Sequence, residues 1–245
     1  MSANRTVLLM GSGEFEPWSE EVERVSLEGR PNSVAILPTA SAPEGDAVFD
    51  RWANMGIEHY AAIGVDARVV PLKTREDAEL DEIAAAIADI GMIFFSGGNP
   101  RYLADTIDGT RFWNEMTAAL DRRTVFAGCS AGAMVAGHRS DSRPKVGATW
   151  VAGLGLVPNG SFGVHWNRMR FIPGMRGFVM SRSKGGWFAG IDERTAILGD
   201  GVEWRVFGLG RVSLRLDGER RTVHPGESFS TPAGTALRSR SASRS

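Results

Sequence analysis

Ser130 stands in a residue pattern that could carry covalent chemistry. The sequence Gly128-Cys129-Ser130-Ala131-Gly132 follows a short apolar run, residues 124–127, and precedes a helix-prone run, residues 131–136. A strand, a tight turn and a helix in this order hold a serine hydroxyl exposed above the end of a sheet. The helix would also direct backbone N–H groups toward negative charge that develops beside the serine. The pattern therefore indicates a nucleophilic serine, and a glycine-rich turn without chemistry is the alternative.

A nucleophilic serine needs a base, and four histidines are available: His59, His138, His165 and His224. His138 follows Ser130 by eight residues on the same predicted helix, about two turns away, which is too far to reach back. His59 is expected on a helix surface. His165 and His224 compete for the role, and His165 is favoured because its segment resembles a half-buried strand that ends among polar residues.

The base in turn needs an acid to orient it. The carboxyl groups that could do this are those of Asp141, Asp192, Glu193 and Asp200. Asp192 and Glu193 lie directly before a predicted strand, where acids are often turn residues. Spacing alone does not decide among the four.

The turn Gly97-Gly98-Asn99-Pro100 follows another predicted strand. A glycine pair at a strand end lets a backbone N–H point into a cleft, and with the N–H of Ala131 it would make a two-donor oxyanion hole. The alternative is a plain turn in which Pro100 opens a helix. Arg168 and Arg170 suggest recognition of a carboxylate, or a solvated arginine-rich loop.

Apolar strands alternate with helices through the first half of the chain, which predicts a mostly parallel sheet with helices on both faces. The expected strands are residues 5–10, 34–38, 67–72, 92–95 and 124–127, and the expected helices are residues 47–62, 76–90 and 101–120, the last broken near Asp108-Gly109. Further strands are expected at residues 195–198, 202–207 and 211–216, with a hairpin turn at Asp217-Gly218 and a return at 221–223. Residues 1–237 are expected to form a single domain, followed by a disordered tail, residues 238–245.

The composition fits a globular protein of ordinary size, either an enzyme or a binding protein. The chain has 245 residues, 42% hydrophobic and 23% charged, with a formal net charge of −1. This charge favours neither nucleic acid nor a cationic partner. A single cysteine, Cys129, excludes an internal disulfide and is expected to pack beneath the serine turn. No apolar run is long enough for a secretory leader or a membrane span, so we expect a cytoplasmic protein.

Taken together, these motifs resemble the serine peptidase family that contains dipeptidase E and cyanophycinase. The resemblance is carried by Phe95-Ser96-Gly97-Gly98-Asn99, by the sequence around Ser130, by Gly153-Leu154-Gly155-Leu156-Val157-Pro158 leading to His165, and by Gly190-Ile191-Asp192-Glu193-Arg194-Thr195-Ala196. The last motif is closer to the cyanophycinase branch. The resemblance implies a class I glutamine amidotransferase-like α/β fold with a C-terminal β-hairpin.

The resemblance also implies roles for individual residues. Those of the catalytic machinery are Ser130 as nucleophile, His165 as general base, Glu193 as acid, and Gly98 and Ala131 as oxyanion donors. Those expected to bind substrate are Asn99, Arg168 and Arg170. Dipeptidase E takes its acid from a segment that would fall near Lys145 here, where Asp141 is a weak substitute.

The chain departs from cyanophycinase at three points that concern the substrate. Asn99 replaces a glutamine, Gly163-Val164 replaces Asp-Gln, and the arginine spacing after His165 differs. We therefore expect a serine peptidase or amidohydrolase that acts on small aspartyl or β-aspartyl peptides, without metal or organic cofactor. We expect it to bind a small peptide that carries a carboxylate, and to bind neither nucleic acid nor a membrane. The sequence does not decide whether it forms a homodimer.

Two alternatives remain at this point. One is an α/β-hydrolase-type esterase with His224 as base and Asp200 or Asp217 as acid. The other is a catalytically silent relative that binds a ligand in the same cleft. An amidotransferase is disfavoured because that chemistry in this fold uses cysteine where Ser130 stands.

Overall fold

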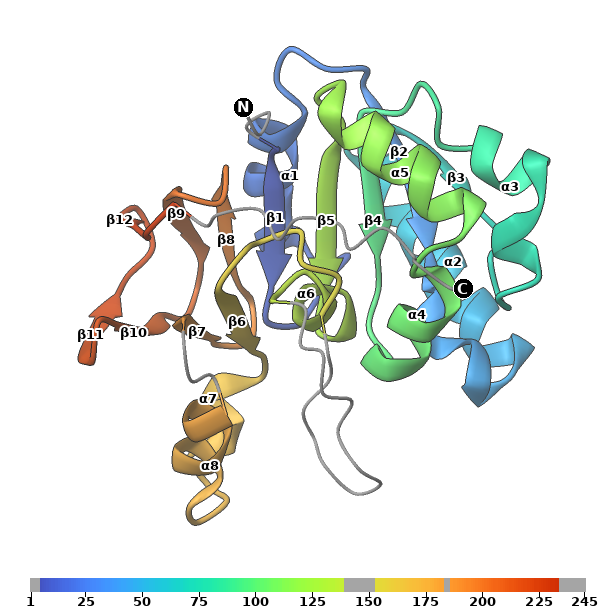
Figure 1. Cartoon of the computed structure of the whole chain (residues 1–245). Helices are drawn as coiled ribbons and strands as arrows, with labels where there is room; N and C mark the ends of the chain where they lie inside the picture. The colour runs from blue at the N-terminus through green and yellow to red at the C-terminus, as the bar shows by residue number, and fades with distance from the viewer. Residues whose placement is uncertain (1–4, 139–152, 183–185, 234–245) are drawn as a thin grey trace.

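The computed structural model describes residues 5–138, 153–182 and 186–233. An eight-stranded sheet forms its centre (Figure 1), built from β1 (Val7–Met10), β2 (Ser33–Leu37), β3 (Asp66–Val69), β4 (Met92–Phe95), β5 (Val125–Cys129), β8 (Thr195–Gly199), β9 (Glu203–Gly208) and β12 (Ser228–Ser230). The strand order is β12-β9-β8-β1-β5-β4-β2-β3. The five neighbouring strands β1, β5, β4, β2 and β3 are parallel to one another. Strands β8, β9 and β12 extend the sheet on the other side of β1 in antiparallel pairing. The predicted mostly parallel sheet is confirmed.

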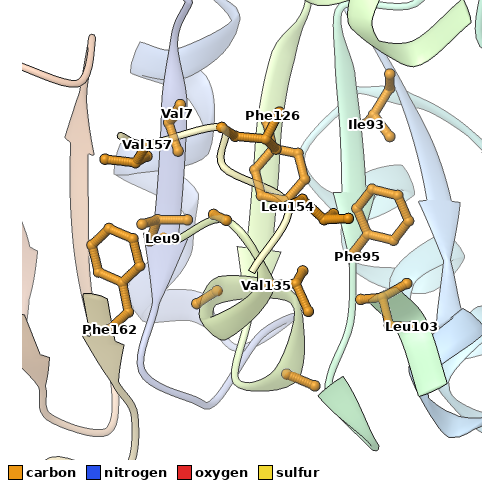
Figure 2. Packing of buried hydrophobic residues seen from close by; sticks show 14 of the residues in the cluster. Val7, Leu9, Ile93, Phe95, Leu103, Phe126, Val135, Leu154, Val157 and Phe162 are labelled. Atoms are coloured by element: carbon orange, nitrogen blue, oxygen red, sulfur yellow. The ribbon is translucent and has the colours of Figure 1, made fainter. Parts of the chain in front are cut away.

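Successive residues of the parallel strands point to opposite faces, so the sheet has two apolar cores. One core holds Leu9, Ile93 and Phe126, and α6 and the segment with Leu154 pack against them (Figure 2). The other core holds their strand neighbours Leu8, Met92 and Val125. A strand covered on both faces has to be apolar throughout, which is why these segments read as unbroken hydrophobic runs.

Helices cover both faces of the sheet (Figure 1). Their bounds are α1 (Glu20–Leu27), α2 (Asp46–Ala62), α3 (Asp81–Ala85), α4 (Pro100–Ile107), α5 (Arg111–Asp121), α6 (Ala131–Val135), α7 (Trp166–Met169) and α8 (Met175–Arg182), with 3₁₀ turns η1 (Pro17–Ser19), η2 (Pro38–Glu44) and η3 (Asp77–Glu79). Residues of α3 to α6 belong to the first core, and residues of α1 and α2 belong to the second.

A second sheet of four strands follows the serine turn along the chain. It consists of β6 (Gly160–Gly163), β7 (Trp187–Ile191), β10 (Val212–Leu216) and β11 (Glu219–Val223), in the order β11-β10-β7-β6. Strands β10 and β11 form the predicted C-terminal hairpin. Its two turn residues, Asp217 and Gly218, have φ angles of 51° and 86°, the left-handed pair that a tight two-residue hairpin requires.

The structure differs from the predicted elements over residues 76–90. The helix expected over residues 76–90 is divided into η3 and α3, because Leu80 between them has an extended backbone with φ −76° and ψ 135°. The break expected near Asp108 is confirmed between α4 and α5. Asp141, Lys145 and the tail, residues 238–245, lie outside the described residues. Within the described ranges, no helix is long and apolar enough to cross a membrane.

Candidate active site

Ser130 sits on a sharp turn between β5 and α6. Its backbone has φ 50° and ψ −107°, a conformation that a residue with a side chain adopts only under constraint. Its N–H donates to the Met10 carbonyl at 3.0 Å, which fixes the turn to the end of β1. A Cβ at Gly128 would lie 2.4 Å from the Gly132 backbone, so both flanking glycines allow the chain to fold back this closely.

His165 follows β6 and brings its ring to the serine. Its backbone is left-handed, with φ 48° and ψ 37°, and its N–H donates to the Gly11 carbonyl at 3.3 Å. The ring Nε2 lies 3.2 Å from Ser130 Oγ, within reach for proton transfer. The structure thus brings His165, and not His224, to Ser130 among the described residues, and the role of His165 as general base stays a prediction.

The Glu193 carboxyl group lies beside Nδ1, the other nitrogen of the His165 ring. Its Oε1 lies 3.1 Å from His165 Nδ1. Asn167 holds the acid from two sides, because its Nδ2 donates to Glu193 Oε2 at 3.3 Å and its Oδ1 accepts the Glu193 N–H at 3.0 Å. Arg168 Nε also lies 3.1 Å from Oε1, so His165 and Arg168 share one carboxylate oxygen. The three groups Ser130, His165 and Glu193 form a continuous hydrogen-bonded path.

The environments of the two neighbouring acids separate their protonation behaviour. Burial alone would raise the pKa of Glu193, but hydrogen bonds from His165 and Asn167 and the charge of Arg168 outweigh it, so its pKa is lowered. Burial raises the pKa of Asp192, and Arg211 opposes this only in part. Glu193 is thus the carboxyl group that is kept ionised beside the imidazole.

The backbone N–H groups of Gly98 and Ala131 are the candidate donors for a developing oxyanion. Gly98 has φ 139°, and a Cβ there would lie 2.3 Å from the Ala40 carbonyl oxygen, so only glycine fits. Within the part of the chain that the structure describes, neither the Gly98 N–H nor the Ala131 N–H donates to a protein acceptor. These are the two donors that the sequence analysis expects.

A cleft of about 880 Å³ opens above Ser130, His165 and Glu193. Three arginines line it: Arg51, Arg168 and Arg194. Arg168 pairs with Glu193, and Arg194 Nε pairs with Glu16 Oε2 at 2.7 Å. Arg51 of α2 lies over the Trp52 ring, 5.5 Å from its centroid, and makes no ion pair among the described residues. Arg51 is therefore the cleft guanidinium that is most open to an incoming anion.

Two residues expected to bind substrate lie differently. The Asn99 side chain caps α4, because its Oδ1 accepts the N–H groups of Arg101 and Tyr102, and it does not line the cleft. Arg170 stacks on Phe171 with its guanidinium 4.6 Å from the ring centroid, also away from the cleft lining. Their roles toward substrate stay predictions.

The other histidines do not approach the serine. His59 is 8% exposed and pairs with buried Glu23 at 2.6 Å, so the expected surface position is wrong. The reason is that this side of α2 packs on α1 and the Phe15 ring. His138 lies just beyond α6, which ends at Val135. His224 is exposed after β11, where its N–H donates to Glu227.

The acids proposed for the esterase alternative are turn residues. Asp200 accepts the N–H groups of Val202 and Glu203, and Asp217 lies in the β10–β11 turn. None of the residues of that alternative triad other than Ser130 lines the cleft. The geometry does not support an esterase site built on His224.

Among the cleft residues that the sequence-based expectations lack are Glu14, Arg51 and Asn167. The signal for Asn167 was its place two residues after His165, and the signal for Glu14 was a glycine-rich turn, Gly11-Ser12-Gly13, at the end of a strand. Arg51 lies on a helix far from every motif, and nothing in its local sequence marks it. Cys129 is fully buried, as expected. In the described ranges no group of three or more His, Cys, Asp or Glu residues could hold a metal ion.

Comparisons with known proteins show the family of this chain. The chain matches the family model of Peptidase family S51 over residues 7–207. Cyanophycinases of Synechococcus elongatus and Thermosynechococcus vestitus are 28% identical over 193 residues, which is 74% of this chain and 58% of each relative. The chain thus spans less than two thirds of the length of these curated relatives.

Solved structures show the same fold. The crystal structure of a peptidase from an acI-B1 Actinobacterium has a TM-score of 0.82 and 29% identity, covering 92% of this chain and 96% of that chain. A putative Peptidase E protein from Listeria monocytogenes EGD-e shares the fold at a TM-score of 0.60 and 18% identity, over 84% of this chain and 99% of that chain. The family resemblance and the fold class inferred from the sequence are confirmed.

Proposed function

Because the chain belongs to peptidase family S51, we propose that it is a serine peptidase that cleaves short aspartyl or β-aspartyl peptides through an acyl-enzyme on Ser130. The observation that carries this proposal is the path from Ser130 Oγ through both nitrogens of His165 to Glu193, with distances of 3.2 Å and 3.1 Å. A nucleophile, a base and an orienting acid in this order define the triad by geometry rather than by sequence position.

The reaction follows from the positions of the three groups. His165 Nε2 takes the proton of Ser130 Oγ while the oxygen attacks the scissile carbonyl carbon. Glu193 accepts the hydrogen bond of Nδ1–H, which keeps Nε2 unprotonated in the resting state and stabilises the imidazolium that forms. His165 then gives the proton to the leaving amine, and water hydrolyses the acyl-enzyme by the same route.

The carbonyl oxygen becomes negatively charged in the tetrahedral intermediate. The N–H groups of Gly98 and Ala131 are the donors proposed to hold it. Because these groups have no protein acceptor in the described structure, they need not break a hydrogen bond when the charge develops. Loss of one such donor typically costs on the order of 100- to 1000-fold in rate.

A carboxylate-bearing substrate is the finer part of the proposal. It is supported by the family, whose relatives include cyanophycinases, and by the guanidinium groups in the cleft. Arg51 has no carboxylate partner among the described residues, so it can bind a substrate carboxylate without breaking an ion pair.

The test combines an active-site probe with a substrate panel. A fluorophosphonate should label the wild-type protein at Ser130, and neither Ser130→Ala nor His165→Ala should be labelled at a comparable rate while both remain folded. Hydrolysis of α- and β-aspartyl dipeptides, followed by amine release, identifies the substrate. An unlabelled wild-type protein would support a catalytically silent relative instead.

A further inference from the structure

Glu14 is a buried acid that the triad does not use. It lies in the loop after β1, between Gly13 with φ 74° and Phe15 with φ 62°. A left-handed backbone is strained for phenylalanine, and the Phe15 ring is fixed by the rings of Phe94, at 5.0 Å, and Tyr60, at 6.0 Å. The loop therefore holds the Glu14 carboxyl in place at the floor of the cleft, where the residue is 4% exposed.

Both oxygens of this carboxyl group accept hydrogen bonds. Oε1 accepts the Gly97 N–H at 3.0 Å, and Oε2 accepts the Cys129 thiol at 2.8 Å. Burial, and next the charge of Glu14, raise the pKa of the Cys129 thiol well above its ordinary value, so its Sγ–H remains a donor. The carboxyl group is thus linked to two separate turns.

The two turns are those that carry the catalytic groups. Gly97 directly precedes Gly98, one proposed oxyanion donor, and Cys129 directly precedes Ser130. The three sites are also close in space. A Cβ placed on Gly97 would lie 3.4 Å from Glu14 Oε1 and 3.8 Å from Ser130 Oγ. The Gly97 N–H is directed to Glu14, which leaves the next N–H, that of Gly98, available to the substrate.

We propose that Glu14 is a positioning residue that sets the spacing between the nucleophile and the Gly98 oxyanion donor by binding the Gly97 N–H and the Cys129 thiol at once. This inference rests on the proposed function, because it assumes that Ser130 and the Gly98 N–H act in one reaction. Glu14 acts through its neighbours and need not touch the substrate.

Removing the carboxyl group frees both turns. Loss of a complete oxyanion donor costs on the order of 100- to 1000-fold, so a displaced donor is expected to cost about 10- to 100-fold. Glu14→Gln keeps an amide oxygen for the Gly97 N–H and nearly the same volume, and its NH₂ group can donate to the Cys129 sulfur, which is a weak acceptor as well as a donor. Both turns therefore stay bound, and the variant should retain the rate within about threefold. If the negative charge of Glu14 were what mattered, Glu14→Ala and Glu14→Gln would lose the same fraction of the rate.

The experiment measures the second-order rate of fluorophosphonate labelling, because the phosphonyl oxygen occupies the oxyanion position. The proteins are the wild type, Glu14→Ala, Glu14→Gln and Glu14→Asp, with thermal unfolding of each measured in parallel. Glu23→Gln is the matched control. Glu23 is also buried and binds His59 and Tyr60, but among the described residues it makes no hydrogen bond to either turn. The control should lower the unfolding temperature and leave the labelling rate of the folded protein unchanged.

A slow Glu14→Ala with a fast Glu14→Gln supports the proposal. A folded Glu14→Ala labelled at the wild-type rate overturns it, as does an equal loss in Glu14→Ala and Glu14→Gln. If Glu14→Ala does not fold, Glu14→Asp replaces it, because the carboxyl group is one methylene shorter and cannot reach both donors. Wild-type-rate labelling of Glu14→Asp would then overturn the proposal. Failure of the wild type itself to label would refute the proposed function, which is a separate result.

Discussion

Replacement of Glu193 by glutamine should slow acyl-enzyme formation by about 100- to 1000-fold. A carboxylate offers two acceptor oxygens, and the structure uses both: Oε1 for His165 and Arg168, and Oε2 for Asn167. Glutamine has one acceptor and one donor. Its NH₂ group must face either Asn167 Nδ2 or His165 Nδ1, so one of these contacts becomes donor to donor.

The magnitude follows from the distance and the exposure. At 3.1 Å, a carboxylate and an imidazolium attract by about 5 kcal/mol at an effective dielectric constant of about 20. The side chains of His165 and Glu193 are 40% and 23% exposed, and Arg168 offsets part of the carboxylate charge. We therefore retain about 3–4 kcal/mol, and about 1.4 kcal/mol per tenfold in rate gives the stated range.

The assay is the fluorophosphonate labelling rate of Glu193→Gln against the wild type, at a pH where both are folded. Asp192→Asn is the matched control, because Asp192 is adjacent in sequence but pairs with Arg211 rather than His165. The control should stay within about threefold of the wild type, well below the loss from an orienting acid. A rate for Glu193→Gln within the same threefold would refute the assignment of Glu193 as the orienting acid.

Two further predictions concern the same cleft. The pKa of Glu193 is lowered in the folded chain, so its ionised form stabilises the fold above its ordinary pKa of about 4.3, and this contribution is lost as the pH falls through the lowered value. The difference in Tm between the wild type and Glu193→Gln should accordingly be constant above about pH 5.5 and shrink below about pH 4, and a difference independent of pH would contradict the lowered pKa. Arg51→Ala should raise KM for carboxylate-bearing peptides about tenfold with little change in kcat, as expected for one lost charge-assisted hydrogen bond, whereas Arg194→Ala, whose partner is Glu16, should change KM less. Equal KM values for Arg51→Ala and the wild type in initial-rate measurements would remove Arg51 from substrate binding.

The sequence predicts those parts of the site that depend on local pattern. The turn at Ser130 is encoded by small residues directly around it, and each glycine there avoids a backbone collision. The same holds for Gly98. Asn99 was expected to bind substrate, but its local sequence also carries a second signal. Asn followed by Pro is a strong start for a helix, and the Asn99 side chain caps α4 in the structure.

The parts that the sequence does not predict depend on distant contacts. Spacing does not choose between the adjacent Asp192 and Glu193, and only the family resemblance favours Glu193. In the folded chain, Asn167 and Arg168 hold Glu193 beside His165. Strand β7 was not predicted, again because contacts with a distant segment determine its sequence. A Cβ at Gly190 within it would lie 2.4 Å from the Trp166 ring, so the glycine reflects packing from another segment rather than a turn.

The division of the expected helix over residues 76–90 also depends on neighbours. Glu79 Oε2 accepts the N–H of Arg111, and Asp81 pairs with the side chain of the same arginine, which ties the break between η3 and α3 to the start of α5. An alanine-rich run with a charged face gives no sign of such contacts. Long-range contacts of this kind are the usual limit of periodicity arguments.

The last residue of β1 and the two residues after it bind the backbone at or beside all three triad residues. Met10 accepts from Ser130, Gly11 accepts from His165 and donates to Thr195, and Ser12 accepts from Arg194. Strand β1 thus has to pair with β8, a strand from much later in the sequence, before the three triad groups can come together. We therefore expect a partly folded chain, in which β8 has not yet docked, to be inactive toward peptides, because the path from Ser130 to Glu193 is incomplete.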